Sequence, residues 1–350
     1  MRNSIFLTII LTFIISCKST FSDKKVNSTT ISTDTLLLDK ISIRAISVSE
    51  NIVFYAGNKS RVGYINLKDK SKKEIRVDND SISLEYRSIA QTDDAIFVVN
   101  IGSPAHLYKI SKDLNSVKLV YSDTNEKVFF DSMQFWNNQE GIAMGDPIDD
   151  CLHIIITNDG GNSWHKISCD KLPKTVEGEA AFAASNSNII VKENLVWIVS
   201  GGKKSRVFLS PDKGKTWEVY ETPIVQGESM TGIFSADFYD KKNGIVAGGN
   251  FEKPTQNFQN KAVTNDGGKI WKLIAENSGF GYASCIQYVP NSNGKKLVSV
   301  GATGIFHSND KGITWKQISS DNSFYTIRFI DASTAIAAGK DKIVKLVFAN

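Results

Sequence analysis

The arginines of this chain are few and recur at similar positions of the sequence. Of its 350 residues, 34 are lysine and only 7 are arginine. Arg44 and Arg87 stand near the start of two β-rich runs, and Arg206 follows shortly after a pair of glycines that ends another. A planar guanidinium binds a carboxylate or phosphate through two parallel hydrogen bonds, whereas a lysine acts as a point charge. Placing arginine at these positions therefore suggests that its planar, bidentate geometry is used there, in a site for a ligand or partner.

Carboxylates and tyrosines share these positions. Asp131 and Glu179 precede two further runs, and Asp146 follows the glycine that ends another. Two carboxylates across a cleft act as general acid and base in the cleavage of a glycosidic bond, which makes these three the catalytic candidates. Tyr282 and Tyr325 precede the last two runs and complete the predicted site. Arginine and acid pairs also fill water-filled channels without any ligand, so both interpretations stay open.

A second set of residues repeats along the chain without gaps. Four segments share the pattern Ser/Thr-x-Asp-x-Gly-x-x-Trp, and their aspartates are 53, 54 and 44 residues apart. A fixed period in this range is typical of blade or solenoid repeats. The aspartate and tryptophan pairs are Asp159 and Trp164, Asp212 and Trp217, Asp266 and Trp271, and Asp310 and Trp315.

The repeated residues are suited to building a turn. An aspartate can accept hydrogen bonds from the backbone N–H groups of its own turn, and the glycine adopts backbone angles that other residues resist. The tryptophan buries a large apolar face beneath the turn. The pattern resembles the Asp-box, and we expect these residues to be structural rather than catalytic.

Pairs of β-rich runs recur along the chain, and the second run of a pair often ends in glycine. Four of these pairs precede one of the Asp-box repeats, whereas the first two pairs and the last have no recognisable box. There are seven such pairs, and seven units over residues 41–350 average about 44 residues, the size of a four-stranded blade. We therefore predict an all-β, seven-bladed β-propeller, with six or eight blades as alternatives. The N-terminal Leu36-Leu37-Leu38 would supply the missing strand of the last blade and close the ring. The first runs of the pairs are 43–48, 86–91, 132–136, 180–185, 232–238, 283–288 and 326–330.

The N-terminus has the features of an export signal. Arg2 precedes an apolar run over residues 5–15, about half of the ~20 residues that a bilayer-spanning helix needs. Cys17 at its end resembles a bacterial lipobox, the alternatives being an ordinary signal peptide and an uncleaved anchor. We expect a signal peptide over 1–16, a tether from lipidated Cys17 over 17–40, and the propeller over 41–350. The lipid would hold the protein on the periplasmic side of the outer membrane.

The remaining cysteines fit an exported protein. Cys151 and Cys169 flank the first box turn, so a hairpin there would bring them close enough for a disulfide, a buried thiol pair being the alternative. No Cys/His spacing resembles a metal site, and we expect neither a metal nor a cofactor. Lysines are scattered, with no basic run longer than two residues, which argues against nucleic acid as a partner. We expect a monomer.

Three segments carry a resemblance to a known family. Residues 131–147 (DSMQFWNNQEGIAMGDP), 178–185 (GEAAFAAS) and 205–217 (SRVFLSPDKGKTW) resemble the photosystem II assembly/stability factor-like group of BNR propellers. That resemblance implies a non-enzymatic role in binding a membrane-protein partner during assembly. It covers residues 41–350. No Gly-x-Gly-x-x-Gly motif supports an oxidoreductase.

Sialidases carry the same box but differ at their site. They need Arg-Ile-Pro near the start, whereas Arg44 is followed by Ala-Ile-Ser. Tyr325 and Arg328 are three apart on a predicted strand and would face opposite sides. We exclude a sialidase and favour a lipid-anchored binding or assembly module with an envelope or membrane protein as partner. A glycan-acting hydrolase or lyase that uses Glu179 with Asp131 or Asp146 is the alternative.

Overall fold

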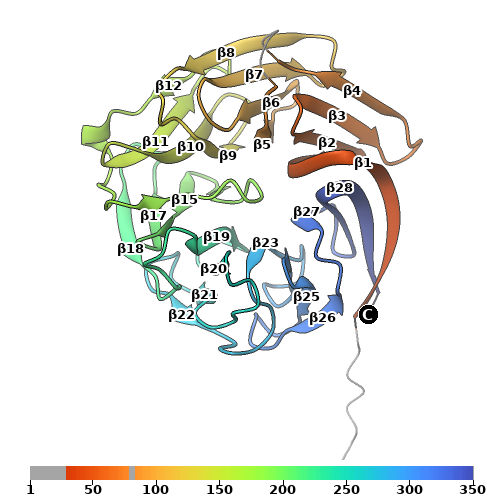
Figure 1. Ribbon diagram of the computed structural model, residues 1–350, viewed down its shortest axis with the longest axis vertical. Coiled ribbons are helices and arrows are strands. Elements are labelled where there is room, and N and C mark those ends of the chain that lie inside the picture. The colour runs from red at the N-terminus through yellow and green to blue at the C-terminus, as the bar shows by residue number, and fades with distance from the viewer. Residues whose placement is uncertain (1–28, 79–82, 350) are drawn as a thin grey trace, which may run out of the picture.

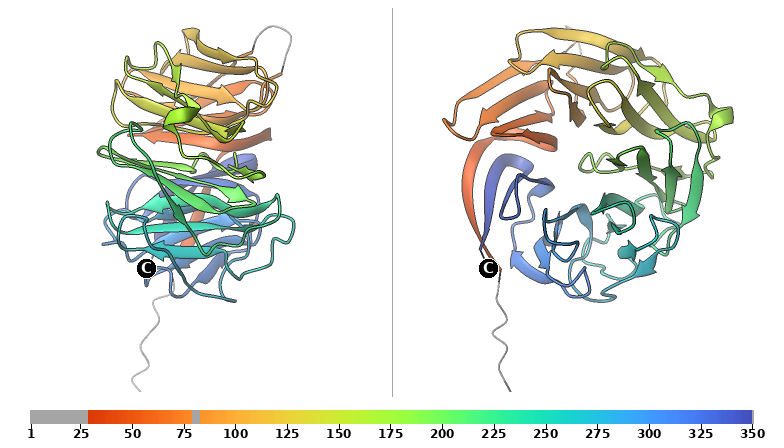
Figure 2. Two further views of the ribbon diagram at one scale, coloured as in Figure 1. Left: turned by 90° about the vertical axis from the view of Figure 1, so that its left-hand side faces the viewer. Right: turned by 180° about the vertical axis from the view of Figure 1, so that it is seen from behind.

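The computed structural model of the protein describes residues 29–78 and 83–349. These residues form a ring of β-sheets around a central axis, with one short 3-10 helix at Cys169–Lys171 (Figure 1). Figure 2 shows the ring from the side and from behind. Within the described ranges, no helix is long and apolar enough to cross a membrane.

Four of the sheets are antiparallel and four-stranded, with their strands mostly consecutive in sequence. They are β5 (Tyr86–Gln91), β6 (Ala95–Asn100), β7 (Ala105–Ser111) and β8 (Val117–Asp123); β9 (Phe130–Phe135), β10 (Gly141–Ile148), β11 (Cys151–Thr157) and β12 (His165–Lys166); β14 (Ile189–Lys192), β15 (Leu195–Val199), β17 (Arg206–Ser210) and β18 (Glu218–Glu221); and β23 (Ala283–Tyr288), β24 (Leu297–Gly301), β25 (Gly304–Ser308) and β26 (Lys316–Ser319).

The other two sheets have six strands each. One follows the order β27 (Phe324–Phe329), β28 (Thr334–Ala349), β1 (Thr30–Ser49), β2 (Ile52–Gly57), β3 (Arg61–Asn66) and β4 (Lys72–Arg76). The second follows the order β13 (Glu179–Ala180), β16 (Gly201–Gly202), β19 (Thr231–Phe238), β20 (Gly244–Asn250), β21 (Lys261–Thr264) and β22 (Lys272–Leu273).

The structure confirms an all-β propeller, but the prediction of seven blades is wrong, because the described strands form six sheets. The first and the last of the seven predicted blades share the long strand β1. Its residues 30–38 pair with β28, and its residues 43–49 pair with β2. Hydrogen bonding through β1 thus joins both units in one sheet, which a count of short apolar runs does not reveal.

The ring begins earlier in the chain than the sequence analysis expected. Residues 17–40 were predicted to be a tether, but residues 30–40 belong to β1, where Thr30 pairs with Ala349 and Leu37 with Ile343. Pairing of the two ends of the chain leaves neither as an open strand edge. The predicted signal peptide and Cys17 lie outside the described residues.

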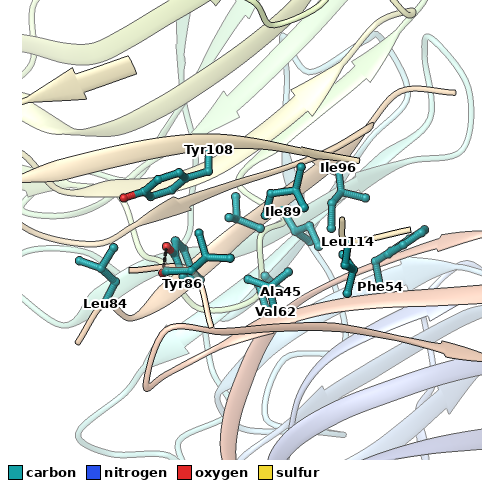
Figure 3. Close-up of a cluster of buried hydrophobic side chains, with 13 residues drawn as sticks. Ala45, Phe54, Val62, Leu84, Tyr86, Ile89, Ile96, Tyr108 and Leu114 are labelled. Atoms are coloured by element: carbon teal, nitrogen blue, oxygen red, sulfur yellow. Dashed lines mark hydrogen bonds between the residues drawn. The ribbon is translucent and has the colours of Figure 1, made fainter. Parts of the chain in front are cut away.

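The core lies between the faces of neighbouring sheets. β6 has a sheet on either side and is buried along its whole length, whereas the outer strand β4 alternates between exposed and half-buried residues. Figure 3 shows the cluster between the β1–β4 and β5–β8 strands, where the Tyr86 hydroxyl donates a hydrogen bond to the Val77 carbonyl. Its labelled side chains are Ala45, Phe54, Val62, Leu84, Tyr86, Ile89, Ile96, Tyr108 and Leu114.

In each of the four repeated turns, backbone N–H groups of the turn itself donate hydrogen bonds to the aspartate side chain. Asp159 Oδ1 accepts hydrogen bonds from the backbone N–H groups of Asn162 (2.9 Å) and Ser163 (3.0 Å). Burial alone would raise the pKa of Asp159, but its hydrogen bonds with Ser163 and Thr157 lower it to about 2. Asp212, Asp266 and Asp310 accept equivalent hydrogen bonds, which leaves these carboxylates committed to the turns.

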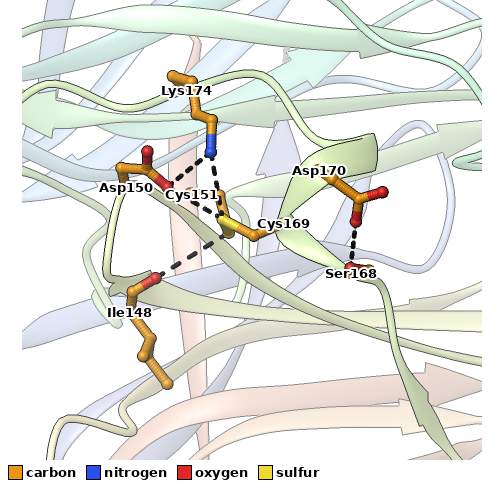
Figure 4. The surroundings of a disulfide bond; sticks show 7 residues. All are labelled: Ile148, Asp150, Cys151, Ser168, Cys169, Asp170 and Lys174. Atoms are coloured by element: carbon orange, nitrogen blue, oxygen red, sulfur yellow. Dashed lines mark hydrogen bonds and ion pairs between the residues drawn. A yellow bond between two sulfur atoms is a disulfide. The ribbon is translucent and has the colours of Figure 1, made fainter.

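A disulfide joins Cys151 at the start of β11 to Cys169 in the 3-10 helix, with 5.7 Å between their Cα atoms (Figure 4). Next to it, Lys174 Nζ lies 2.8 Å from Asp150 Oδ1. The disulfide closes a loop of 18 residues around the first box turn.

Removing this disulfide is expected to destabilise the ring. A cross-link over a loop of this length stabilises a fold by about 3 kcal/mol, chiefly by restricting the unfolded chain. Urea unfolding of the oxidised and the reduced protein should therefore differ by about that amount. The double variant Cys151→Ala/Cys169→Ala is the matched control, and a response of that variant to reductant would assign the effect elsewhere.

Candidate functional site

A segment without strand structure crosses the centre of the ring. Residues 181–188, which we call the plug, connect β13 to the strand β14, and Figure 1 shows this loop reaching inward toward the axis. All eight residues of the plug are buried. Because the axis of a propeller otherwise holds an open channel, the plug divides this channel into two separate cavities.

Hydrogen bonds fix the plug to strands all around the ring. Asn186 carries the most: its Oδ1 accepts from Met133 N (3.0 Å), and its Nδ2 donates to Ile89 O (2.7 Å). Ser187 Oγ bonds to Ser235 Oγ at 2.8 Å. The remaining bonds join Ser185 Oγ to Ser284 O, Thr326 Oγ1 to Ser185 O, Arg328 Nη2 to Ser185 O and Asn186 O, and Arg44 Nη1 to Ala184 O.

The plug lies where the sequence predicted the first strand of a blade, so that prediction is wrong. The sequence pattern predicts residues 180–185 as the innermost strand of a blade, but β14 pairs with β15 in that position instead. Ala-Phe-Ala-Ala reads as a short buried strand because it is apolar, and burial on the axis satisfies the same pattern.

A cavity of about 300 Å³ lies on one side of the plug. Its floor is apolar, because Phe182 of the plug stacks on Phe234 with 3.8 Å between ring centroids. Phe251 and Met230 extend this apolar surface. The polar side chains of the wall are Arg44, Arg87, Asp146, Ser229 and Tyr282.

The two arginines differ in how firmly they are held. The Arg44 guanidinium lies 4.0 Å from the centre of the Tyr325 ring and donates to Ala184 O, while its buried Nε–H has no partner in the described structure. Burial, and then the positive charge of Arg87, lowers the pKa of Arg44. Arg87 pairs with Glu85 at 2.8 Å, and both side chains are partly exposed. Arg87 can therefore turn toward a ligand at little cost.

Two carboxyl groups stand in unlike surroundings: Asp146 lines the cavity, whereas Asp131 is buried and does not. Asp146 Oδ1 accepts from the backbone N–H of Ala181 at 2.8 Å, and burial raises its pKa to about 6. Asp131 is fully buried, and neither of its carboxyl oxygens has a donor in hydrogen-bonding geometry. Burial, and then the charge of Asp146, raises the pKa of Asp131 well above its usual range.

Glu179 and Arg206 form a pair of their own and do not line the cavity. The Glu179 carboxylate accepts from Arg206 Nε (3.0 Å) and Nη2, from Ser200 Oγ (2.6 Å) and from Val176 N (3.1 Å). Its side chain is fully buried and that of Arg206 is 12% exposed. These hydrogen bonds tie Val176, Ser200 and Arg206 to Glu179. Both oxygens of the carboxylate are occupied by these partners and are not available to a substrate.

The structure thus brings together four of the eight predicted site residues and separates the others. The cavity is lined by four of them, Arg44, Arg87, Asp146 and Tyr282. Tyr325 does not line it, but its ring contacts the Arg44 guanidinium. The apolar floor was not predicted. Among the described residues, the one group with metal-ligating side chains close together is Asp150, Cys151 and Cys169, and its two sulfurs are joined in the disulfide.

Replacing Asp131 with Asn is expected to stabilise the protein at neutral pH. A carboxyl pKa raised by folding stabilises the folded state below the unfolded pKa of about 3.9, and this contribution is lost as the pH rises through the folded value. Asp131→Asn should therefore raise the free energy of unfolding by about 1–3 kcal/mol at pH 7.5 and by less at pH 4.5. Asp94→Asn, at an exposed turn, is the control. An equal gain at both pH values would contradict the prediction.

No protein-family model matches this sequence, and no curated protein matches it. Solved structures do. A structure described as YCF48 bound to D1 peptide has a TM-score of 0.66 at 14% identity, over 93% of this chain and 97% of that one. Its fold is shared. YCF48 from Cyanidioschyzon merolae gives 0.63 at 11% identity (90% and 98%), and a streptogramin B lyase gives 0.66 at 15% identity (91% and 98%). At these identities the likeness concerns the fold alone.

Proposed function

We propose that this chain is a non-catalytic binding or assembly module, anchored by lipid on Cys17 in the cell envelope, that takes up a segment of a partner protein in the cavity above the plug. The observation that carries the proposal is the pair Arg44 and Arg87 beside an apolar floor. Residues of β1, β5, β10 and β19 line this cavity together with the plug and neighbouring loops, and cavities that bind ligands are usually largely preformed.

The chemistry of the cavity defines the segment that fits. Arg87 and the unpartnered Nε–H of Arg44 offer donors to a carboxylate. Phe182, Phe234 and Phe251 offer contact area to an aromatic or aliphatic side chain. The partner segment therefore carries an acidic group next to a large apolar side chain. The YCF48 structure with a bound D1 peptide supports a peptide as ligand of this fold.

Fluorescence anisotropy with labelled peptides tests the proposal. Peptides that contain Asp-Phe or Glu-Leu should bind, and their Lys-Phe counterparts should not. Arg87→Gln should weaken binding by about tenfold or more, because a charge-assisted hydrogen bond contributes about 1.5–3 kcal/mol. Arg76→Gln, an exposed arginine paired with Asp78, is the control. If acidic and basic peptides bind equally well, or Arg87→Gln has no effect, the proposal fails.

A further inference from the structure

The channel contains a second cavity on the opposite side of the plug. It measures about 330 Å³ and is formed by the far ends of the inner strands β1, β5, β9, β23 and β27. Asn186 of the plug contributes to its wall, so this cavity ends at the plug rather than opening into the arginine-lined cavity. A blind cavity of this size lies at the lower end of the range for small-molecule sites, about 300–1,000 Å³.

Amide groups dominate the polar wall of this cavity. Gln91, Gln134 and Gln287 reach it from three different strands, β5, β9 and β23. No carboxylate of the described residues lines it. The one charged side chain is Arg328, whose guanidinium already donates to Thr326 Oγ1, Ile327 O, Ser185 O and Asn186 O. The cavity therefore offers little to a charged ligand and much to a neutral one with many hydrogen-bonding groups.

Several of these amide atoms have no protein partner. Gln91 Nε2 donates to Val48 O at 3.0 Å, but its Oε1 is buried and accepts no hydrogen bond. The Gln134 side chain makes no hydrogen bond to any described residue, while Gln287 Oε1 accepts from Phe329 N at 3.2 Å. A polar group without a protein partner is stabilised by a ligand that bonds to it, so the cavity favours a molecule with hydrogen-bonding groups.

We propose that this amide-lined cavity binds a neutral, hydroxyl-rich molecule of the size of one monosaccharide. A hydroxyl group donates and accepts at once, as does a glutamine side chain, so each can bond to the other in either direction. The Gln134 amide would bond to one sugar hydroxyl, and Gln91, whose side chain lines the same cavity, to a neighbouring one. This site is separate from the arginine-lined cavity and does not depend on the proposed function.

Saturation-transfer NMR on the full chain tests the proposal, with glucose, N-acetylglucosamine and a tetrasaccharide of each as probes. Signals from the single sugars would identify a free monosaccharide as the ligand. Signals only from the terminal unit of the tetrasaccharides would identify the end of a glycan chain. Absence of saturation transfer to all four probes overturns the proposal.

Two variants place the binding in this cavity. Gln134→Leu removes a side chain that has no protein partner, so the fold should be retained and the dissociation constant should rise about tenfold. Gln91→Leu should have a similar effect. Arg87→Gln, on the other side of the plug, is the matched control and should leave sugar binding unchanged. Binding that persists in both glutamine variants would show that the sugar lies elsewhere.

Discussion

The variant Asn186→Ala is expected to lower the free energy of unfolding by about 3–5 kcal/mol. Asn186 is 1% exposed, and its amide serves Met133 N, Ser132 Oγ and Ile89 O on two different sheets. Truncation leaves a buried N–H and a buried carbonyl without partners, each at a cost of about 1–3 kcal/mol. Its φ of 55° adds strain for alanine, because asparagine tolerates the left-handed region better.

Asn188→Ala is the matched control two residues away. Asn188 is also fully buried, but neither atom of its amide has a hydrogen-bond partner. Removing it should change the stability by less than about 1 kcal/mol. Chemical unfolding followed by tryptophan fluorescence compares the two variants. Equal losses would mean that the plug is held by packing rather than by its hydrogen bonds.

Glu179→Ala is expected to have an effect of similar size, about 3–5 kcal/mol, since it leaves a nearly buried arginine without its counter-charge. Ser200 Oγ and Val176 N lose an acceptor at the same time. The loss should appear in thermal unfolding at neutral pH and should exceed that of Glu179→Gln, which retains one acceptor oxygen.

Two comparisons separate this pair from ordinary surface charges. Glu85→Ala breaks a partly exposed pair with Arg87 and should cost no more than about 1 kcal/mol. The double variant Glu179→Leu/Arg206→Leu should recover part of the loss, because no buried charge remains. If Glu179→Ala retained full stability, the carboxylate would be free for another role, and the catalytic interpretation of Glu179 would regain support.

The sequence predicted what depends on local pattern. The box turns follow from side chains and glycines within eight residues of one another, and their hydrogen bonds are those expected of Asp159 and its equivalents. The number of sheets depends on which strands share hydrogen bonds across the ring. Nothing local in β1 shows that it pairs with β2 and β28 at once.

The sequence suggested some of the charged residues that line the cavity, but not the shape of the cavity. Position along a run correctly suggested that Arg44 and Arg87 share one side of the ring. The plug was missed because its apolar residues resemble a strand, although the Ser-Asn-Ser-Asn sequence of residues 185–188 is unusual for one. The side chains of Ser185, Asn186 and Ser187 find their partners on several strands, which only the closed ring brings together.

The pairing of β1 with β28 also determines when, during synthesis, this sheet can be completed. Thr30 is made long before its partner Ala349. At about 5–20 residues per second, synthesis of the intervening chain takes roughly 15–60 s. Throughout that period residues 30–38 of β1 lack their partner strand, whereas residues 43–49 can already pair with β2. The β1–β28 pairing can therefore form only after β28 has been made, and a truncation that removes β28 would expose the edge of β1 that it covers.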